Sequence, residues 1–209
     1  MTTALVIALA YALGAVPFSF LAARLVADTD IRKVGDENVG AANVFRHAGL
    51  VAGIAALAGD VGKGVLVVVA ARWFGAGWLL VMLAGAAVVM GHNRTPMLRF
   101  RGGRGASPTA GVLFVLAPGG VVIAAGLTVA VFLATRSMTW SGFSLFAPVP
   151  LACWLLGAPL SLVGYTAALP CLVGLTHAVS VRHLPEGARR ETGMLWVARG
   201  GDERARAYR

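Results

Sequence analysis

Long runs of apolar residues constrain this chain more than any other feature. A helix needs about 20 apolar residues to cross the hydrocarbon of a membrane. Charged residues make up only 13% of the chain, whereas soluble domains carry about 25%. The sequence therefore predicts an all-α integral membrane protein. Its apolar runs cover approximately residues 4–26, 50–71, 78–90, 106–135, 143–156 and 160–181.

The run at 106–135 is too long for one span, and Pro118-Gly119-Gly120 interrupts it. Proline and glycine end or start helices, so we expect one helix up to Ala117 and another over 121–135. This division gives seven transmembrane helices. We expect a single membrane-embedded domain over residues 1–209, with 181–209 forming a basic cytoplasmic tail.

The distribution of positive charge predicts the orientation. Lys and Arg accumulate in cytoplasmic loops. With seven spans, the turns on one side of the membrane hold a single positively charged residue, Arg72. The N-terminus is therefore expected outside and the C-terminus in the cytoplasm, as in a bacterial-type cell membrane. The cytoplasmic side then holds Arg32, Lys33, Arg46, Arg94, Arg99, Arg101, Arg104, Arg136, Arg182, Arg189 and Arg190.

Other features of the composition exclude some functions. The net charge of +9 is concentrated in polar loops beside apolar spans, so it does not indicate nucleic-acid binding. Cys153 and Cys171 both fall in apolar runs and are expected to be small buried residues rather than a disulfide or metal site. The first 26 residues lack a basic n-region and predict a span rather than a cleaved signal peptide.

The polar segment 35–46 is a candidate anion site. Asn38, Asn43 and Arg46 lie among small residues just before a helix. Amides and helix N-terminal N–H groups hold oxyanions, and an arginine supplies charge. The alternative is an ordinary polar connector.

Asp60 and Lys63 lie inside the second apolar run. Charges at that depth are costly, so they pair or line a polar cavity. The i,i+3 spacing favours an ion pair on one helical face. The alternative is that Lys63 faces an anion and Asp60 positions it.

The segment 91–105 holds four arginines and four glycines in fifteen residues. Glycines let the backbone approach an anion, and arginine forks pair with phosphate oxygens. The alternative is a topology signal that contacts lipid headgroups. His92 is either an acid or base or a hydrogen-bonded structural residue. Arg182 and His183 end the last span at headgroup level, and His177 is expected to be structural.

Together these segments resemble the bacterial acyl-phosphate-dependent glycerol-3-phosphate acyltransferases of the PlsY type. The resemblance covers about residues 10–190 and rests on four motifs in order. They are Asp36-Glu37-Asn38-Val39-Gly40-Ala41-Ala42-Asn43-Val44-Phe45-Arg46; Asp60-Val61-Gly62-Lys63-Gly64; Gly91-His92 with Pro96, Phe100 and Gly102-Gly103-Arg104-Gly105; and Arg182-His183 with Glu186 and Arg189.

The resemblance implies transfer of an acyl group from acyl phosphate to the 1-hydroxyl of glycerol 3-phosphate, giving lysophosphatidate for phospholipid biosynthesis. It implies no cofactor and no metal, a site facing the cytoplasm, and membrane lipids as the surroundings. It leaves the oligomeric state open. It assigns catalytic roles to His183, Lys63 and Arg104, and substrate or phosphate binding to Asn38, Gly40, Asn43, Arg46, His92, Gly102, Gly103 and Ser107.

Several motif positions depart from the family pattern. Asp36 and Glu37 replace Ser and Gly, and these carboxylates would repel phosphate unless they are paired or turn away. The other departures are Ala42 for Thr, Arg104 for Lys, and Glu186 for Asn. After the glycines, Ala106-Ser107-Pro108 stands where the family has Val-Ala-Thr, with Thr109 one position late. The alternatives are an altered or inactive paralogue that binds a phospholipid, a phosphorylated ligand or a partner, and a transporter of an anionic metabolite.

Overall fold

The computed structural model describes residues 2–182, and all regular secondary structure in this range is helical. His183 and the rest of the expected basic tail lie outside the described residues. The elements are α1 (Thr3–Ala15), α2 (Phe18–Ala27), η1 (Ile31–Lys33), α3 (Ala41–His47), α4 (Gly49–Trp73), α5 (Trp78–Asn93), η2 (Pro96–Leu98), α6 (Ala106–Leu116), α7 (Pro118–Thr135), α8 (Met138–Phe146), α9 (Val149–Leu155) and α10 (Leu160–Arg182).

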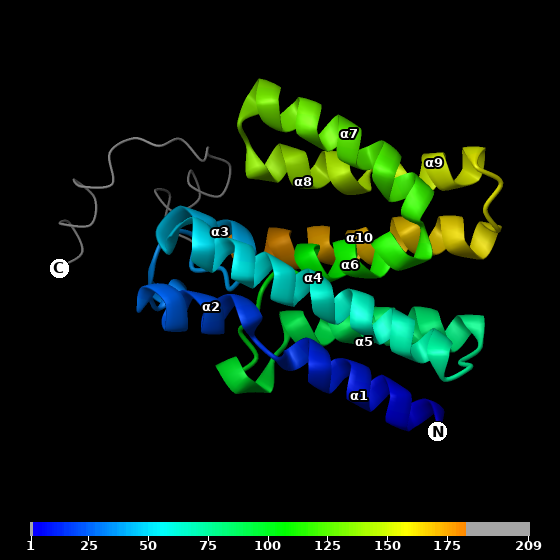
Figure 1. The fold of residues 1–209 in the computed structure, drawn as a ribbon, viewed down its shortest axis with the longest axis horizontal. Coiled ribbons are helices and arrows are strands. Elements are labelled where there is room, and N and C mark those ends of the chain that lie inside the picture. The colour runs from blue at the N-terminus through cyan, green and yellow to red at the C-terminus, as the bar shows by residue number, and fades with distance from the viewer. Residues whose placement is uncertain (1, 183–209) are drawn as a thin grey trace.

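The long helices lie side by side along one axis of the molecule (Figure 1). Helix α1 packs along α5, α4 packs against α6, and α7 packs against α8. The N-terminus and the turns α4–α5 and α9–α10 lie at one end of this axis (Figure 1). Helices α2 and α3 lie at the opposite end, so the polar segment between them is separated from those turns.

Four helical stretches are long and apolar enough to cross a membrane: Thr3–Ala27, Gly49–Trp73, Pro118–Thr135 and Leu160–Val179. Shorter apolar helices cover Ala106–Leu116 and Trp140–Leu155. Many large apolar side chains on these helices are exposed. Water would make such faces unfavourable, whereas lipid does not. The prediction of an all-helical membrane protein is confirmed at this level.

Two apolar runs that we expected to be single helices are broken. The run 4–26 breaks at Val16 and Pro17, between α1 and α2, and the run 143–156 breaks at Ala147 and Pro148, between α8 and α9. Proline lacks an N–H, so both breaks lose a helical hydrogen bond. Val16, before Pro17, is also extended, with ψ 118°, whereas Ala147 keeps helical geometry. Mean hydropathy does not register either break because the flanking residues stay apolar.

The break near Pro118 has the expected place but different bounds. Helix α6 ends at Leu116, and α7 starts at Pro118 rather than at residue 121. Pro118 is the first residue of α7, where a missing N–H costs no helical hydrogen bond. Gly119 and Gly120 are therefore part of the helix.

Two buried apolar clusters hold the fold together. The larger one joins α1 and α4 to α7, α9 and α10. The smaller one joins α2, α3 and the start of α4, and it includes Ile31, Val44 and Leu98. Because Leu98 belongs to the arginine-rich segment, this second cluster anchors both polar segments to the same end of the bundle.

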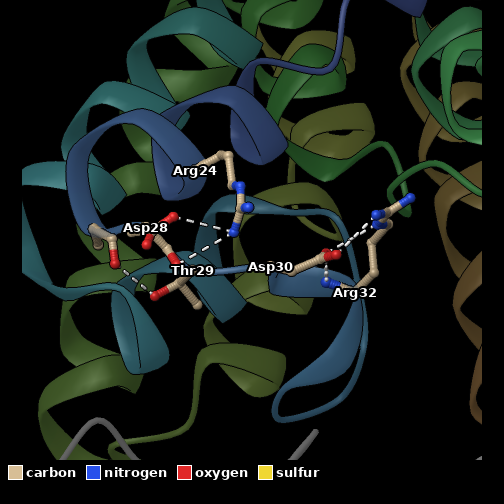
Figure 2. Close-up of polar contacts among 6 residues, drawn as sticks. Arg24, Asp28, Thr29, Asp30 and Arg32 are labelled. Atoms are coloured by element: carbon tan, nitrogen blue, oxygen red, sulfur yellow. Dashed lines mark hydrogen bonds and ion pairs between the residues drawn. The ribbon is translucent and has the colours of Figure 1, made fainter.

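Local ion pairs shape the turn after α2 (Figure 2). Asp28 ends the helix in a left-handed conformation, with φ 45°, and its carboxylate lies 3.2 Å from the guanidinium of Arg24. Arg32 donates to both carboxylate oxygens of Asp30, at 2.9 and 2.8 Å. These hydrogen bonds lower the pKa of Asp30 to about 2. The turn thus directs the chain into the segment that carries Asp36.

Candidate active site

A buried charge pair lies in the middle of α4. The Nζ of Lys63 is 2.9 Å from Oδ1 of Asp60, and both side chains have no exposed surface. Ser19 of α2 donates to the other carboxylate oxygen at 2.5 Å. The i,i+3 pair expected from the sequence is confirmed. Ser19 could not be identified from the sequence, because it is a single small polar residue in an apolar run.

The same ammonium closes the break between α1 and α2. Lys63 donates to the carbonyl oxygens of Gly14, at 2.9 Å, and Val16, at 3.0 Å. The helix break leaves carbonyl groups without helical donors, and such groups are costly when they are buried. Lys63 therefore supplies hydrogen bonds to the carbonyl oxygens at the helix break, and its ammonium group faces protein groups in this structure.

His92 connects this network to the glycine segment. Its Nδ1 lies 2.9 Å from Nζ of Lys63 and 3.3 Å from Oδ1 of Asp60. On the other side of the ring, a Cβ added at Gly103 would collide with Nε2. A Cβ at Gly102 would collide with the carbonyl oxygen of His92. These two glycines are therefore required for close approach to the end of α5.

A second charge cluster lies next to Gly103 along the chain. The Nη1 of Arg104 donates to Oδ2 of Asp36 at 2.8 Å, and Nη2 of Arg46 lies 3.4 Å from the same oxygen. The Asp36 side chain is 1% exposed, and the two arginine side chains are 11% and 10% exposed. Asp36 is therefore paired, whereas Glu37 is exposed. Pairing of Asp36 therefore uses the same two guanidiniums, those of Arg46 and Arg104, that would be needed to bind a phosphate.

The remaining arginines of the segment 91–105 point elsewhere. Arg94, Arg99 and Arg101 are exposed, whereas Arg104 is largely buried. The segment thus divides into an exposed basic surface and one arginine directed into the protein. The family resemblance had singled out Arg104 among these four residues, whereas composition and spacing did not distinguish them.

Asn43 organises the loop before α3. Its Nδ2 lies within hydrogen-bond distance of the carbonyl oxygens of Ile31, Val34 and Asn38. Its amide hydrogens are thus used within the protein. Gly40 precedes the first residue of α3, and a Cβ there would meet the Asn38 side chain. These residues fix the loop that carries Asp36.

The backbone donors of the glycine segment are also used internally. Gly102 N donates to Asn93 O, and Gly103 N donates to His92 O. Ser107 lies in the first turn of α6 and is half-buried. Pro108 follows in the same turn, where proline is tolerated, so this departure from the family pattern fits the fold.

Helix α10 contributes two neighbours that the sequence analysis did not assign to the site. Thr176 donates to the carbonyl oxygen of Arg104 at 2.9 Å. His177 is half-buried and lies within electrostatic range of Arg104 and Asp36. Among the described residues, no group of three His, Cys, Asp or Glu side chains is arranged to hold a metal ion. Arg46 and Arg104 give the cluster two fixed cations, which are suited to bind an anion.

Sequence comparison identifies relatives along almost the whole chain. A profile of the family described as glycerol-3-phosphate acyltransferase matches residues 4–189. "Glycerol-3-phosphate acyltransferase 4" of Dehalococcoides mccartyi is 40% identical over 180 residues, which is 85% of this chain and 96% of that protein. "Glycerol-3-phosphate acyltransferase" of Rubrobacter xylanophilus is 40% identical over 194 residues, which is 92% of this chain and 96% of that protein.

Solved structures with the same fold agree with these relatives. A crystal structure of PlsY (YgiH), an integral membrane glycerol 3-phosphate acyltransferase in its glycerol 3-phosphate form, aligns with a TM-score of 0.80 at 24% identity and covers 93% of this chain and 96% of that one. The lysophosphatidic acid form aligns with a TM-score of 0.77 at 22% identity, covering 93% and 95%. On the strength of the profile and the near-full-length relatives, this chain belongs to the glycerol-3-phosphate acyltransferase family.

Proposed function

We propose that this chain is a membrane acyltransferase that moves an acyl group from acyl phosphate to the 1-hydroxyl of glycerol 3-phosphate. The observation that carries the proposal is the convergence of Arg46 and Arg104 on one oxygen of Asp36, in a chain of this family. Two guanidiniums that share one anionic oxygen are suited to bind a phosphate group.

The reaction needs little covalent chemistry from the protein. The substrate hydroxyl oxygen attacks the carbonyl carbon of the acyl phosphate, and the bond from that carbon to the phosphate oxygen breaks. The hydroxyl proton is taken up by the released phosphate. Because the mixed anhydride is already activated, fixed cations and correct positioning supply the catalysis. On this proposal Arg46 and Arg104 bind phosphate, and the Lys63–His92 network holds the glycine segment beside them.

We further propose seven membrane spans within one domain, with the N-terminus outside and the site at the cytoplasmic face of the cell membrane. The exposed arginines Arg94, Arg99 and Arg101 support this orientation, because positive residues accumulate on the cytoplasmic side. Thiol labelling of Arg101→Cys in a background without other cysteines tests the orientation. Labelling by an impermeant reagent applied to intact cells would contradict it.

The family relationship does not favour the alternatives of a non-catalytic binding paralogue or a transporter. His183 and Glu186 lie outside the described residues. The catalytic role of His183, and the place of Glu186 in the same motif, therefore remain predictions. The roles of Asn38 and Ser107 in substrate binding are likewise proposals.

The test is acyl transfer by the purified full-length protein in lipid, with palmitoyl phosphate and radiolabelled glycerol 3-phosphate. We expect labelled lysophosphatidate from the wild type and a loss of at least about 100-fold in Arg104→Ala, because charge-assisted contacts to phosphate are lost. Arg101→Ala is the matched control, because it removes the same charge from an exposed position in the same segment. No product from folded wild type, or equal turnover in the two variants, would refute the proposal.

A further inference from the structure

The Asp36 carboxylate occupies the point at which the two inward-facing guanidiniums meet. Arg104 donates to its Oδ2 at 2.8 Å, and Arg46 lies 3.4 Å from the same atom. The other oxygen, Oδ1, accepts a long hydrogen bond of 3.4 Å from the backbone N–H of Asn38. The carboxylate is therefore held by three separate parts of the chain.

A carboxylate and a phosphate oxygen make the same demands on an arginine fork. Both are anionic acceptors, and guanidinium groups bind both with similar geometry. A phosphate bound by Arg46 and Arg104 would lie beside Asp36, where two like charges with little access to water repel each other. One anion must give way to the other.

We infer that Asp36 is an internal competitor for the substrate phosphate, so that it weakens phosphate binding to Arg46 and Arg104 and sets the substrate concentration at which the enzyme works. The inference rests on the proposed function for its kinetic consequences, but the competition itself is a binding property. It assigns Asp36 a specificity-determining role through the arginines, without contact to the reacting atoms.

The position of Asp36 in the motif supports this reading. The family pattern has serine there, which carries no charge, so the carboxylate is an added anion in this chain. The neighbouring departure behaves differently. Glu37 replaces glycine, adopts φ 54°, and is exposed, and no described contact joins it to either arginine. Comparing variants of Asp36 with variants of Glu37 therefore distinguishes a direct effect on the two arginines from a general effect of negative charge in the loop.

The first experiment measures binding of inorganic phosphate and of glycerol 3-phosphate to the purified full-length protein by titration calorimetry. Asp36→Asn keeps the shape of the side chain and removes its charge, and Asp36→Ser restores the residue of the family motif. We expect both variants to bind phosphate about tenfold more tightly than the wild type. Glu37→Gln is the matched control and is expected to stay within about twofold.

The second experiment separates the two substrate phosphates. In Asp36→Asn, we expect KM to fall about tenfold for the substrate whose phosphate the arginines hold, with the other substrate saturating. A fall for glycerol 3-phosphate assigns the pair to the acceptor, and a fall for acyl phosphate assigns it to the donor. A purely structural role for Asp36 would lower stability or kcat without lowering either KM.

Two results would overturn the inference. One is unchanged or weaker phosphate binding in both Asp36 variants, each verified as folded by its thermal unfolding midpoint. The other is an equal gain in Glu37→Gln. Failure of the proposed function is distinguishable: tighter phosphate binding by Asp36→Asn in a protein that forms no lysophosphatidate would sustain the competition and reject the acyl transfer.

Discussion

The buried network around Lys63 makes a quantitative prediction about stability. Lys63→Met keeps most of the side-chain volume and removes the ammonium. The substitution leaves Asp60 buried with Ser19 and His92 as its remaining polar neighbours. It also removes the donor that serves the carbonyl oxygens at the break between α1 and α2.

The size of the effect follows from these losses. Removing one partner of a buried ion pair costs about 3–5 kcal/mol, and each buried acceptor left without a donor costs about 1–3 kcal/mol. We therefore expect Lys63→Met to lower the free energy of unfolding by about 5 kcal/mol. In the double variant Asp60→Asn/Lys63→Met no buried charge is left alone, so its cost should fall at least about 2 kcal/mol short of the sum of the single variants.

The assay is unfolding by SDS in mixed micelles, followed by fluorescence of the five tryptophans. Lys33→Met is the matched control, because it makes the same substitution at an exposed position of η1, and it should change stability by less than about 0.5 kcal/mol. A cost below about 1 kcal/mol for Lys63→Met, or costs that simply add in the double variant, would refute this account of the network.

Two further predictions concern the glycine segment and the turn after α2. Gly103→Ala should destabilise the protein by about 2–3 kcal/mol, because the new methyl group collides with the His92 ring. Gly62→Ala is the control: its methyl group meets no neighbouring atom on α4, so it should be neutral or stabilise by up to about 1 kcal/mol. Equal SDS unfolding curves for the two variants would contradict this prediction. In an NMR titration the pKa of Asp30 should lie about 2 and rise toward 3.8 in Arg32→Gln. Because the pKa of Asp30 is lowered in the folded protein, the Asp30–Arg32 interaction contributes to stability above pH about 4, and this contribution is lost as the pH falls through about 2. An unchanged Asp30 titration midpoint in Arg32→Gln would show that Arg32 does not cause the shift.

The sequence predicted the helical membrane architecture well because long apolar runs have few other solutions. It also predicted the pairing of Asp60 with Lys63, since their i,i+3 spacing is a local property of one helix. It did not predict that Lys63 would donate to the carbonyl oxygens at the break near Pro17. These oxygens belong to Gly14 and Val16, which lie 49 and 47 positions from Lys63 in the sequence.

The contacts of the candidate site were harder to predict for the same reason. Asp36 and Arg104 are 68 positions apart, and nothing local to either residue indicates the other. The residue types alone indicate that Asp36 and Glu37 would repel a phosphate unless they are paired or turn away, but they do not identify a partner. The partner could be identified only after the second apolar cluster had placed both polar segments at one end of the bundle.

The contact between Lys63 and the carbonyls of Gly14 and Val16 also bears on how the chain enters a bilayer. A first segment alone would bring the Gly14 carbonyl oxygen into hydrocarbon without its Lys63 donor, and an α4 segment alone would bring an ammonium and a carboxylate. Each insertion is expensive by itself. When the two segments insert together, their polar groups hydrogen-bond to one another. The smallest unit that partitions favourably into the membrane is therefore the pair formed by the first segment and α4. Biogenesis of this protein is therefore expected to retain the first segment at the translocon until the second has emerged.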